Sequence, residues 1–576
     1  SRSVFLFRRG AHLAGPAAAS CERVDGSFMS FLQLVRREMH GSLPKLLFMS
    51  GLGGISTAAI LGAINSGLQN GSTLWASTLF IVALFLFIKT QSYVTITTTA
   101  EIEAIIHKIR VRLMDQIRHS ELLSIEDVGR ARIVAAITSD SAVLTQASNM
   151  LAFTVQGVVL IVFVAIYVAF LSVAAILTTI VVVSIAAVIF HQKNRRLVSE
   201  KQRAAAWERR LFDRLTDFLD GFKEVRLNSA RSMDLFNDAV DVSRTAANIK
   251  INTQAETFRM IVTSQISMYV LLGAVVFVAP QFSDTLGGAA LTKTTTALMF
   301  IVGACFGLVQ SIPILLNANA SADRIVQLEN VLRATASRRS TEVPMAKRFD
   351  KIEMRKINFR YVDKFSEAAF KIGPIDFTLR PGELVFITGG NGSGKSTFLR
   401  VLSGIYPPDS GEIILDGKHI DNSTRDEYRA LMSAIFFDYH LFRRLYGVPD
   451  PEPSEVARLL SLFRLSEKTG LIDGEFRTLD LSGGQRRRLA LIVSLLEKRP
   501  ILLLDEWTAE QDPEFRRKFY DELLPDLMKA GATVVVITHD DRYLDELNLP
   551  ARRIRMDEGK IVEERTIKST TRPRRR

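Results

Sequence analysis

Six long apolar runs dominate the first half of the chain and predict helices that cross a membrane. They lie at residues 46–68, 74–96, 150–171, 173–190, 262–281 and 291–316. A helix that spans a bilayer needs about 20 consecutive, mainly apolar residues. One such run could be a buried helix of a soluble protein. Six in one half of a chain favour a membrane domain, which we place at residues 29–330.

Two long polar segments separate these runs, one between the second and third and the other between the fourth and fifth. They cover residues 97–149 and 191–261, hold few prolines or glycines, and show the apolar recurrence of helices. Each is interrupted near its middle, at about residues 124–130 and 221–228. Short crosswise helices that touch another domain and plain hairpin turns explain these breaks equally well.

The pattern changes in the second half of the chain. Residues 317–332 predict an amphipathic helix, and residues 331–349 form a mainly polar linker. Strands and helices with turn signals then alternate from 350 to 566, which predicts an α/β domain. The basic stretch 567–576 is expected to be a solvated tail.

Composition and charge agree with a membrane protein. The chain is 47% hydrophobic with a formal net charge of +12. Lysines and arginines gather before the first apolar run and in the two long polar segments, whereas the loop at 67–73 is uncharged. The positive-inside rule therefore predicts six spans with both termini in the cytosol. No basic–aromatic patch suggests nucleic acid, and the two distant cysteines suggest neither a disulfide framework nor a metal site.

Residues 1–28 differ from the rest of the chain. Arg8 and Arg9 in an alanine-rich context weakly suggest a targeting peptide, whereas Met29 resembles a natural start. We favour an extra or upstream segment and exclude it from the fold.

A phosphate-binding loop is the clearest chemical motif. It reads Gly389-Gly390-Asn391-Gly392-Ser393-Gly394-Lys395-Ser396-Thr397, after an apolar strand and at the start of a helix. The glycines allow backbone N–H groups to surround phosphates at a helix N-terminus. Lys395 is expected to reach the β- and γ-phosphates and the Ser396 hydroxyl to bind Mg²⁺, so the motif predicts ATP and Mg²⁺ as cofactors.

Two carboxylates follow a second apolar strand downstream of this loop. Asp505 and Glu506 come directly after residues 501–504. A strand end holds a carboxylate rigidly, so Asp505 is the expected Mg²⁺ ligand. Glu506 is the expected catalytic residue that orients or deprotonates the attacking water.

The most specific motif is Leu481-Ser482-Gly483-Gly484-Gln485, at the start of another apolar helix. This pentapeptide resembles the signature of the ATP-binding-cassette (ABC) family, and the resemblance covers almost the whole chain from Met29. It implies an α-helical membrane domain of six transmembrane helices, similar to type IV ABC exporters. An α/β P-loop ATP-binding-cassette domain follows it. Ser482, Gly483, Gly484 and Gln485 are then expected to bind ATP.

The resemblance implies further site residues. Tyr361 matches the position where the family stacks an aromatic ring on adenine, although an ordinary strand tyrosine fits as well. Asp512 ends the loop after the second acid. His539 follows the strand at residues 533–538 and matches the family's γ-phosphate histidine, a catalytic residue beside Glu506 and Lys395.

One loop departs from the family pattern. The family usually has a Gln that senses Mg²⁺ and contacts the membrane domain, whereas Phe437 stands at that position here, followed by Asp438. A phenylalanine cannot bind Mg²⁺. Asp438 could replace the Gln as a metal ligand, could face Arg130 and Arg226 near the two breaks, or could be only a solvated acid.

Three runs narrow the resemblance to bacterial exporters of cyclic peptides and peptide siderophores. They are residues 436–442, 481–491 and 505–513, the last with Trp507 after the two acids. The resemblance implies a half-transporter that works as a homodimer in the bacterial inner membrane and exports a small peptide-type molecule. A lipid or multidrug exporter shares every ATPase motif. A soluble ABC ATPase is disfavoured by the six apolar runs, and an importer by the order of the domains.

Overall fold

A computed structural model describes residues 29–38, 43–70, 74–282, 288–335, 348–362, 369–448 and 451–567. Three segments treated separately above lie wholly or mostly outside these residues: the extra segment 1–28, most of the linker 331–349, and the basic tail after residue 567. The chain divides into two compact units. The first holds residues 1–114 and 131–330, and the second holds residues 115–130 and 331–576.

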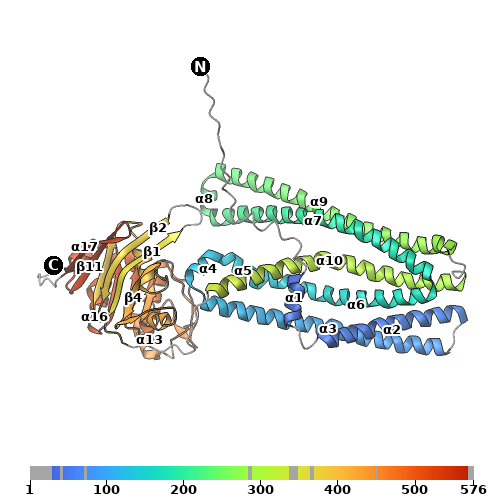
Figure 1. The fold of residues 1–576 in the computed structure, drawn as a ribbon. Coiled ribbons are helices and arrows are strands. Elements are labelled where there is room, and N and C mark those ends of the chain that lie inside the picture. The colour runs from blue at the N-terminus through green and yellow to red at the C-terminus, as the bar shows by residue number, and fades with distance from the viewer. Residues whose placement is uncertain are drawn as a thin grey trace, which may run out of the picture. The chain divides into compact units, whose positions relative to one another are not determined.

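The first unit is made of long helices. They are α1 (Met29–Glu38), α2 (Leu43–Asn70), α3 (Leu74–His119), α5 (Arg130–Ala135), α6 (Ser141–Leu171), α7 (Val173–Asp220), α8 (Phe222–Leu227), α9 (Ser229–Gly273) and α10 (Ala289–Thr335). A π-helical turn at Ala136–Asp140 joins α5 to α6, and a π-helical and a 3₁₀ turn extend α9 to Phe282. Helices α7 and α9 pack together along most of their lengths (Figure 1).

Six of the described helical stretches are long and apolar enough to cross a membrane, as the sequence predicts. Only 11–28% of each apolar window is buried inside the protein. Apolar helices that expose this much surface require lipid around them. Helices α3, α7 and α9 continue well beyond their apolar windows, which confirms that the long polar segments are helical.

Short helices stand at both predicted breaks. Helix α4 (Leu122–Val128) lies at the first, and α8 at the second. Between the two alternatives, the structure therefore selects short helices over plain hairpin turns. Residues 115–130, with α4 among them, belong to the same compact unit as the α/β domain.

The second unit is built on two main sheets. Their strands are β1 (Ile352–Val362), β2 (Ala369–Leu379), β3 (Leu384–Gly389), β4 (Ser410–Leu415), β5 (Lys418–His419), β6 (Met432–Ile435), β9 (Ile501–Asp505), β10 (Thr533–Ile537), β11 (Ala551–Asp557) and β12 (Lys560–Ile567). An antiparallel sheet has the order β2-β1-β4-β5. A six-stranded sheet has the order β12-β11-β3-β10-β9-β6 and is parallel except for β12. A small hairpin pairs β7 (Leu471–Ile472) with β8 (Glu475–Phe476).

Helices cover the six-stranded sheet and complete the unit. They are α11 (Lys395–Leu402), α12 (Arg425–Arg429), α13 (Pro453–Leu462), α14 (Gly483–Leu496), α15 (Pro513–Lys518), α16 (Leu524–Lys529) and α17 (Asp541–Asp545). Strands β3, β9 and β10 are buried along almost their whole length. Because parallel strands carry their carboxyl ends to one edge, Gly389, Asp505 and the residues after Ile537 meet there.

Candidate active site

The phosphate loop connects the end of β3 to the start of α11. Gly389 and Gly394 have φ angles of 146° and 95°, which residues with a side chain rarely adopt. A Cβ on Gly389 would lie 2.2 Å from the Met556 carbonyl oxygen, and one on Gly394 would lie 2.8 Å from Ile372. The loop therefore requires glycine at both positions. Asn391 and Gly392 are exposed at its tip, while Ser393 is buried.

The buried side chains of this loop fit a polyphosphate. The Lys395 ammonium donates to the carbonyl oxygens of Gly389 and Gly390, at 3.1 and 2.9 Å. Burial lowers the Lys395 pKa, against the pull of Glu506 and Asp505. Within the described residues, the buried Ser393 hydroxyl has no hydrogen-bond partner. An ammonium, a free hydroxyl and the N-terminus of α11 together suit an anion.

Ser396 and Asp505 come together across the sheet edge, as the two motifs predict. The Ser396 hydroxyl donates to Asp505 Oδ1 at 3.2 Å, and Asp505 is only 2% exposed. Burial raises the Asp505 pKa, while the hydrogen bonds from Ser396 and the Phe437 backbone lower it. A hydroxyl and a carboxylate are the hard oxygen ligands that Mg²⁺ prefers, so these residues would hold the ion.

Glu506 and His539 form the second functional pair. His539 Nε2 lies 3.1 Å from Glu506 Oε1. The Glu506 backbone is left-handed, with φ 49° and ψ 36°, and its N–H donates to the Ile537 carbonyl. A non-glycine residue in this conformation costs on the order of 1 kcal/mol, which its surroundings must offset. In this backbone conformation the Glu506 carboxylate reaches His539.

The signature residues begin α14. Ser482 is the N-cap: its hydroxyl accepts from the Gln485 N–H, and its own N–H donates to Gln485 Oε1 at 3.0 Å. Asp512 caps α15 in the same way, accepting from the Phe515 N–H at 2.8 Å. That hydrogen bond is the main cause of the lowered Asp512 pKa. Thr397 lies in the first turn of α11, and Tyr361 is 41% exposed near the end of β1.

The Phe437–Asp438 pair has partners that the sequence does not indicate. Asp438 accepts two hydrogen bonds from Arg400, at 3.1 and 3.2 Å. This partner is not among the three roles for Asp438 that the sequence suggests. Phe437 lies under the guanidinium of Arg487, 5.2 Å from ring centroid to Cζ. Trp507, beside the two acids, is fully buried and donates its indole N–H to the Arg487 carbonyl.

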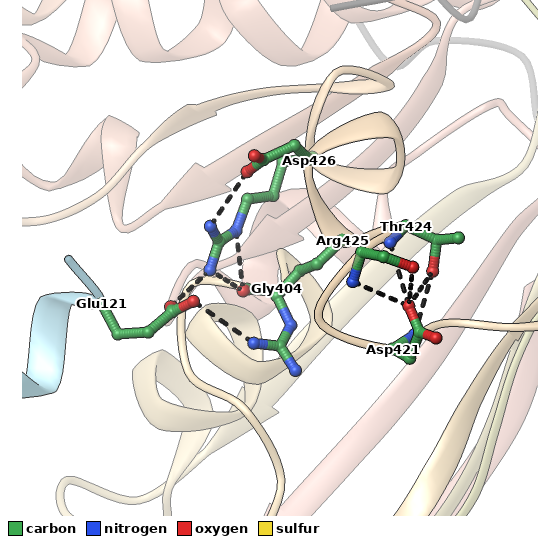
Figure 2. Close-up of polar contacts among 8 residues, drawn as sticks. Glu121, Gly404, Asp421, Thr424, Arg425 and Asp426 are labelled. Atoms are coloured by element: carbon green, nitrogen blue, oxygen red, sulfur yellow. Dashed lines mark hydrogen bonds and ion pairs between the residues drawn. The ribbon is translucent and has the colours of Figure 1, made fainter. Parts of the chain in front are cut away.

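Sequence reasoning also missed a group of polar residues around α4. Glu121, next to that helix, accepts from Arg425 at 3.3 Å and from Arg429 at 2.6 Å (Figure 2). Leu122 and Leu123 of α4 pack against the hydrophobic core of the α/β domain. Nothing in the sequence marks Glu121, because ordinary acids and arginines occur throughout the chain. Only the fold places them together.

The comparisons with known proteins agree with this site. A family model described as ABC transporter matches residues 372–509. The chain is 31% identical over 557 residues to the ATP-binding protein SyrD of Pseudomonas syringae pv. syringae, covering 92% of this chain and 96% of SyrD. The chain belongs to the ABC transporter family. It is a multi-pass membrane protein whose ATPase domain couples ATP hydrolysis to transport.

Two further comparisons add detail. The chain is 34% identical over 214 residues to the probable syringafactin export ATP-binding/permease protein SyfD of Pseudomonas syringae pv. syringae (strain B728a). That match covers 35% of this chain and 32% of SyfD. The fold is similar to a structure described as a bacterial Atm1-family ABC exporter with ATP bound. The TM-score is 0.73 at 17% identity, over 92% of this chain and 96% of that chain. Six transmembrane helices followed by an ABC ATPase domain are therefore the architecture of this transporter.

Proposed function

We propose that this transporter exports a small peptide-type molecule, such as a cyclic peptide or a peptide siderophore, across the bacterial inner membrane. The observation that carries the proposal is the likeness to SyrD over nearly the full length of both chains. SyfD, which matches over 35% of this chain, is named as a probable exporter of syringafactin. The exporter-type fold supports the same direction of transport.

The working unit is proposed to be a homodimer. One phosphate loop and one signature occur in the chain. In this family the ATP lies between the phosphate loop of one subunit and the signature of the other, so two copies would build two sites. Ser482 and Gln485, which cap α14, would then face the phosphates bound by the partner subunit, with Tyr361 beside the adenine.

The chemistry of each site follows from its geometry. Lys395 and the amides of the phosphate loop would hold the phosphates, and Ser396 and Asp505 the Mg²⁺, which screens phosphate charge. Glu506 would accept the proton of the attacking water, and His539 would hold the Glu506 carboxylate and contact the γ-phosphate. Asp512 forms an ion pair with Arg488 of α14. This pair would keep the loop between Glu506 and Asp512 against that helix.

Transport requires that ATP binds one state of the dimer far better than the other. In this proposal ATP closes the two ATPase domains, which opens the membrane helices outward, and hydrolysis resets them. Helix α4 is the described segment that connects two spans and belongs to the ATPase unit, so it is placed to carry the motion.

The proposal is tested with the full chain in inside-out vesicles. ATP should drive uptake of a cyclic lipopeptide into the vesicles, and the same compound should stimulate ATPase activity. A fluorescent phospholipid serves as the control substrate. ATP-driven movement of the lipid but not the peptide would favour the lipid or multidrug alternative, and ATP-driven loss of peptide from preloaded inside-out vesicles would indicate an importer. A reporter fused after residue 71 should be periplasmic, and one after Arg203 cytosolic.

A further inference from the structure

A buried arginine, which is not one of the expected site residues, contacts the backbone of the proposed catalytic residue Glu506. The Arg487 side chain, on α14, is 2% exposed. Its guanidinium donates to the backbone carbonyl of Glu506 and lies 3.2 Å from a carboxylate oxygen of Glu510. A guanidinium is costly to remove from water. When it is buried, it therefore needs polar partners of this kind that fix its position.

The guanidinium also lies over the ring of Phe437. The ring centroid is 5.2 Å from Arg487 Cζ. An aromatic ring at this distance attracts a guanidinium through its negative face. Phe437, which stands at the position of the family's Gln, is thus linked to the Glu506 backbone through Arg487.

The Glu506 carbonyl is the point at which this contact matters. Glu506 has a left-handed backbone, and its carbonyl oxygen accepts both the Arg487 guanidinium and the Ala509 N–H. A strained backbone persists only where its surroundings hold it. A change in the backbone angles of Glu506 that reorients its Cα–Cβ bond would move the carboxylate away from His539 and from the water that it is proposed to activate.

We propose that Arg487 is a positioning residue for Glu506, and that the Phe437 ring holds Arg487 in place. The inference rests on the proposed role of Glu506. In this inference Phe437 holds Arg487 in place and does not sense the metal. Arg487 is on the same helix as Ser482 and Gln485, which are proposed to meet the partner's ATP. A shift of α14 on ATP binding therefore reaches the catalytic carboxylate of its own subunit through Arg487.

The first test compares Phe437→Leu with Phe442→Leu in the full-length transporter. Both residues are more than half exposed, and the Phe442 ring lies against the rings of His440 and Tyr446. Loss of a cation–π contact predicts that Phe437→Leu lowers kcat about two- to fivefold. The KM for ATP should stay within about twofold, because the phosphate loop is unchanged. Phe442→Leu should leave both constants at wild-type values.

Arg487→Lys keeps the charge but loses the planar fork, and kcat should fall about 10- to 100-fold because the carboxylate is misplaced. In that background, Phe437→Leu should have no further effect, since the two residues act through one contact. If the two effects multiply instead, or if either substitution raises the KM alone, Phe437 and Arg487 do not act as a unit on Glu506.

Hydrogen exchange of the nucleotide-free protein supplies a readout independent of turnover. Amides at residues 507–511 should exchange faster in Phe437→Leu and Arg487→Lys than in wild type or Phe442→Leu. Unchanged exchange and unchanged kcat in Phe437→Leu would overturn the inference. A wild-type protein without ATPase activity would refute the proposed role of Glu506 instead. The exchange comparison would still show whether Phe437 and Arg487 hold the Glu506 backbone.

Discussion

The Tyr406 hydroxyl donates to the Glu126 carboxylate, with oxygen–oxygen distances of 2.9 and 3.2 Å. The same hydroxyl accepts from Arg400 at 2.9 Å, and Arg400 also holds Asp438. Burial is the main reason that the Tyr406 pKa rises to about 12, so the hydroxyl keeps its proton at physiological pH. A continuous polar chain therefore runs from Asp438 through Arg400 and Tyr406 to Glu126, which belongs to α4.

Removal of the Tyr406 hydroxyl should weaken the stimulation of ATPase activity by the transported molecule. Tyr406→Phe keeps the ring stacked on Phe359 but leaves Glu126 and Arg400 without their shared partner. We expect substrate-stimulated ATPase activity to fall about 5- to 10-fold, as for loss of a buried hydrogen bond, with basal activity within about twofold of wild type. Tyr446→Phe, at an exposed tyrosine, is the control. Equal stimulation in the two variants would remove Tyr406 from the coupling path.

Glu121 should be required to hold α4 in place. Its side chain is 15% exposed and lies between Arg425 and Arg429, so Glu121→Ala removes this anion from Arg425 and leaves Arg429 with Asp426. The loss should be about 1–3 kcal/mol in the local free energy of opening. Hydrogen exchange at residues 121–128 measures it. Asp115→Asn, which breaks an exposed pair with Arg118, should leave that exchange unchanged.

The sequence predicted the membrane helices and the ATP site because both depend on local patterns. Apolar runs identify the spans. The phosphate loop, the signature and the strand that ends in Asp505 are each defined by a short stretch of consecutive residues. The positions of Arg400, Tyr406 and Arg487 could not be predicted, since each gains its role from contacts with distant segments. Asp438 shows the limit well. It lies three residues after the end of β6, yet its carboxylate forms an ion pair with Arg400.

Replacement of Glu506, the proposed catalytic carboxylate, should separate ATP binding from turnover. Glu506→Gln retains a group that can hydrogen-bond to His539, but an amide cannot accept the proton of water. We expect the turnover rate to fall about 10²- to 10⁴-fold, while ATP affinity stays within a few-fold. Rapid-quench kinetics and a fluorescent ATP analogue measure the two quantities. Glu522→Gln, at an exposed acid, is the control. Wild-type turnover in Glu506→Gln would show that another group is the base.

The opposite result is expected at the phosphate loop. Lys395→Ala removes the ammonium that is proposed to meet the β- and γ-phosphates, so ATP affinity itself should fall about 10- to 100-fold. Equilibrium titration with the same fluorescent analogue in the absence of turnover measures this loss. Lys418→Ala changes a lysine of the exposed strand β5 and should bind ATP as the wild type does. Equal affinity in both variants would contradict the role of Lys395.

The last prediction concerns Asp438, where metal binding and coupling lead to different results. Its carboxylate is 67% exposed and paired with Arg400, which in turn reaches α4 through Tyr406. Because an exposed pair contributes about 1 kcal/mol or less, Asp438→Ala should lower substrate stimulation only about two- to fivefold. Asp438→Lys, which repels Arg400, should lower it further.

The Mg²⁺ dependence separates the two roles of Asp438. A guanidinium already holds its carboxylate, and Ser396 and Asp505 form a separate oxygen pair. The Mg²⁺ concentration that supports half-maximal ATPase activity should therefore be the same in wild type, Asp438→Ala and the exposed control Asp473→Asn. A higher requirement in Asp438→Ala alone would instead make Asp438 a metal ligand. Unchanged Mg²⁺ dependence together with unchanged stimulation would leave it a solvated surface acid.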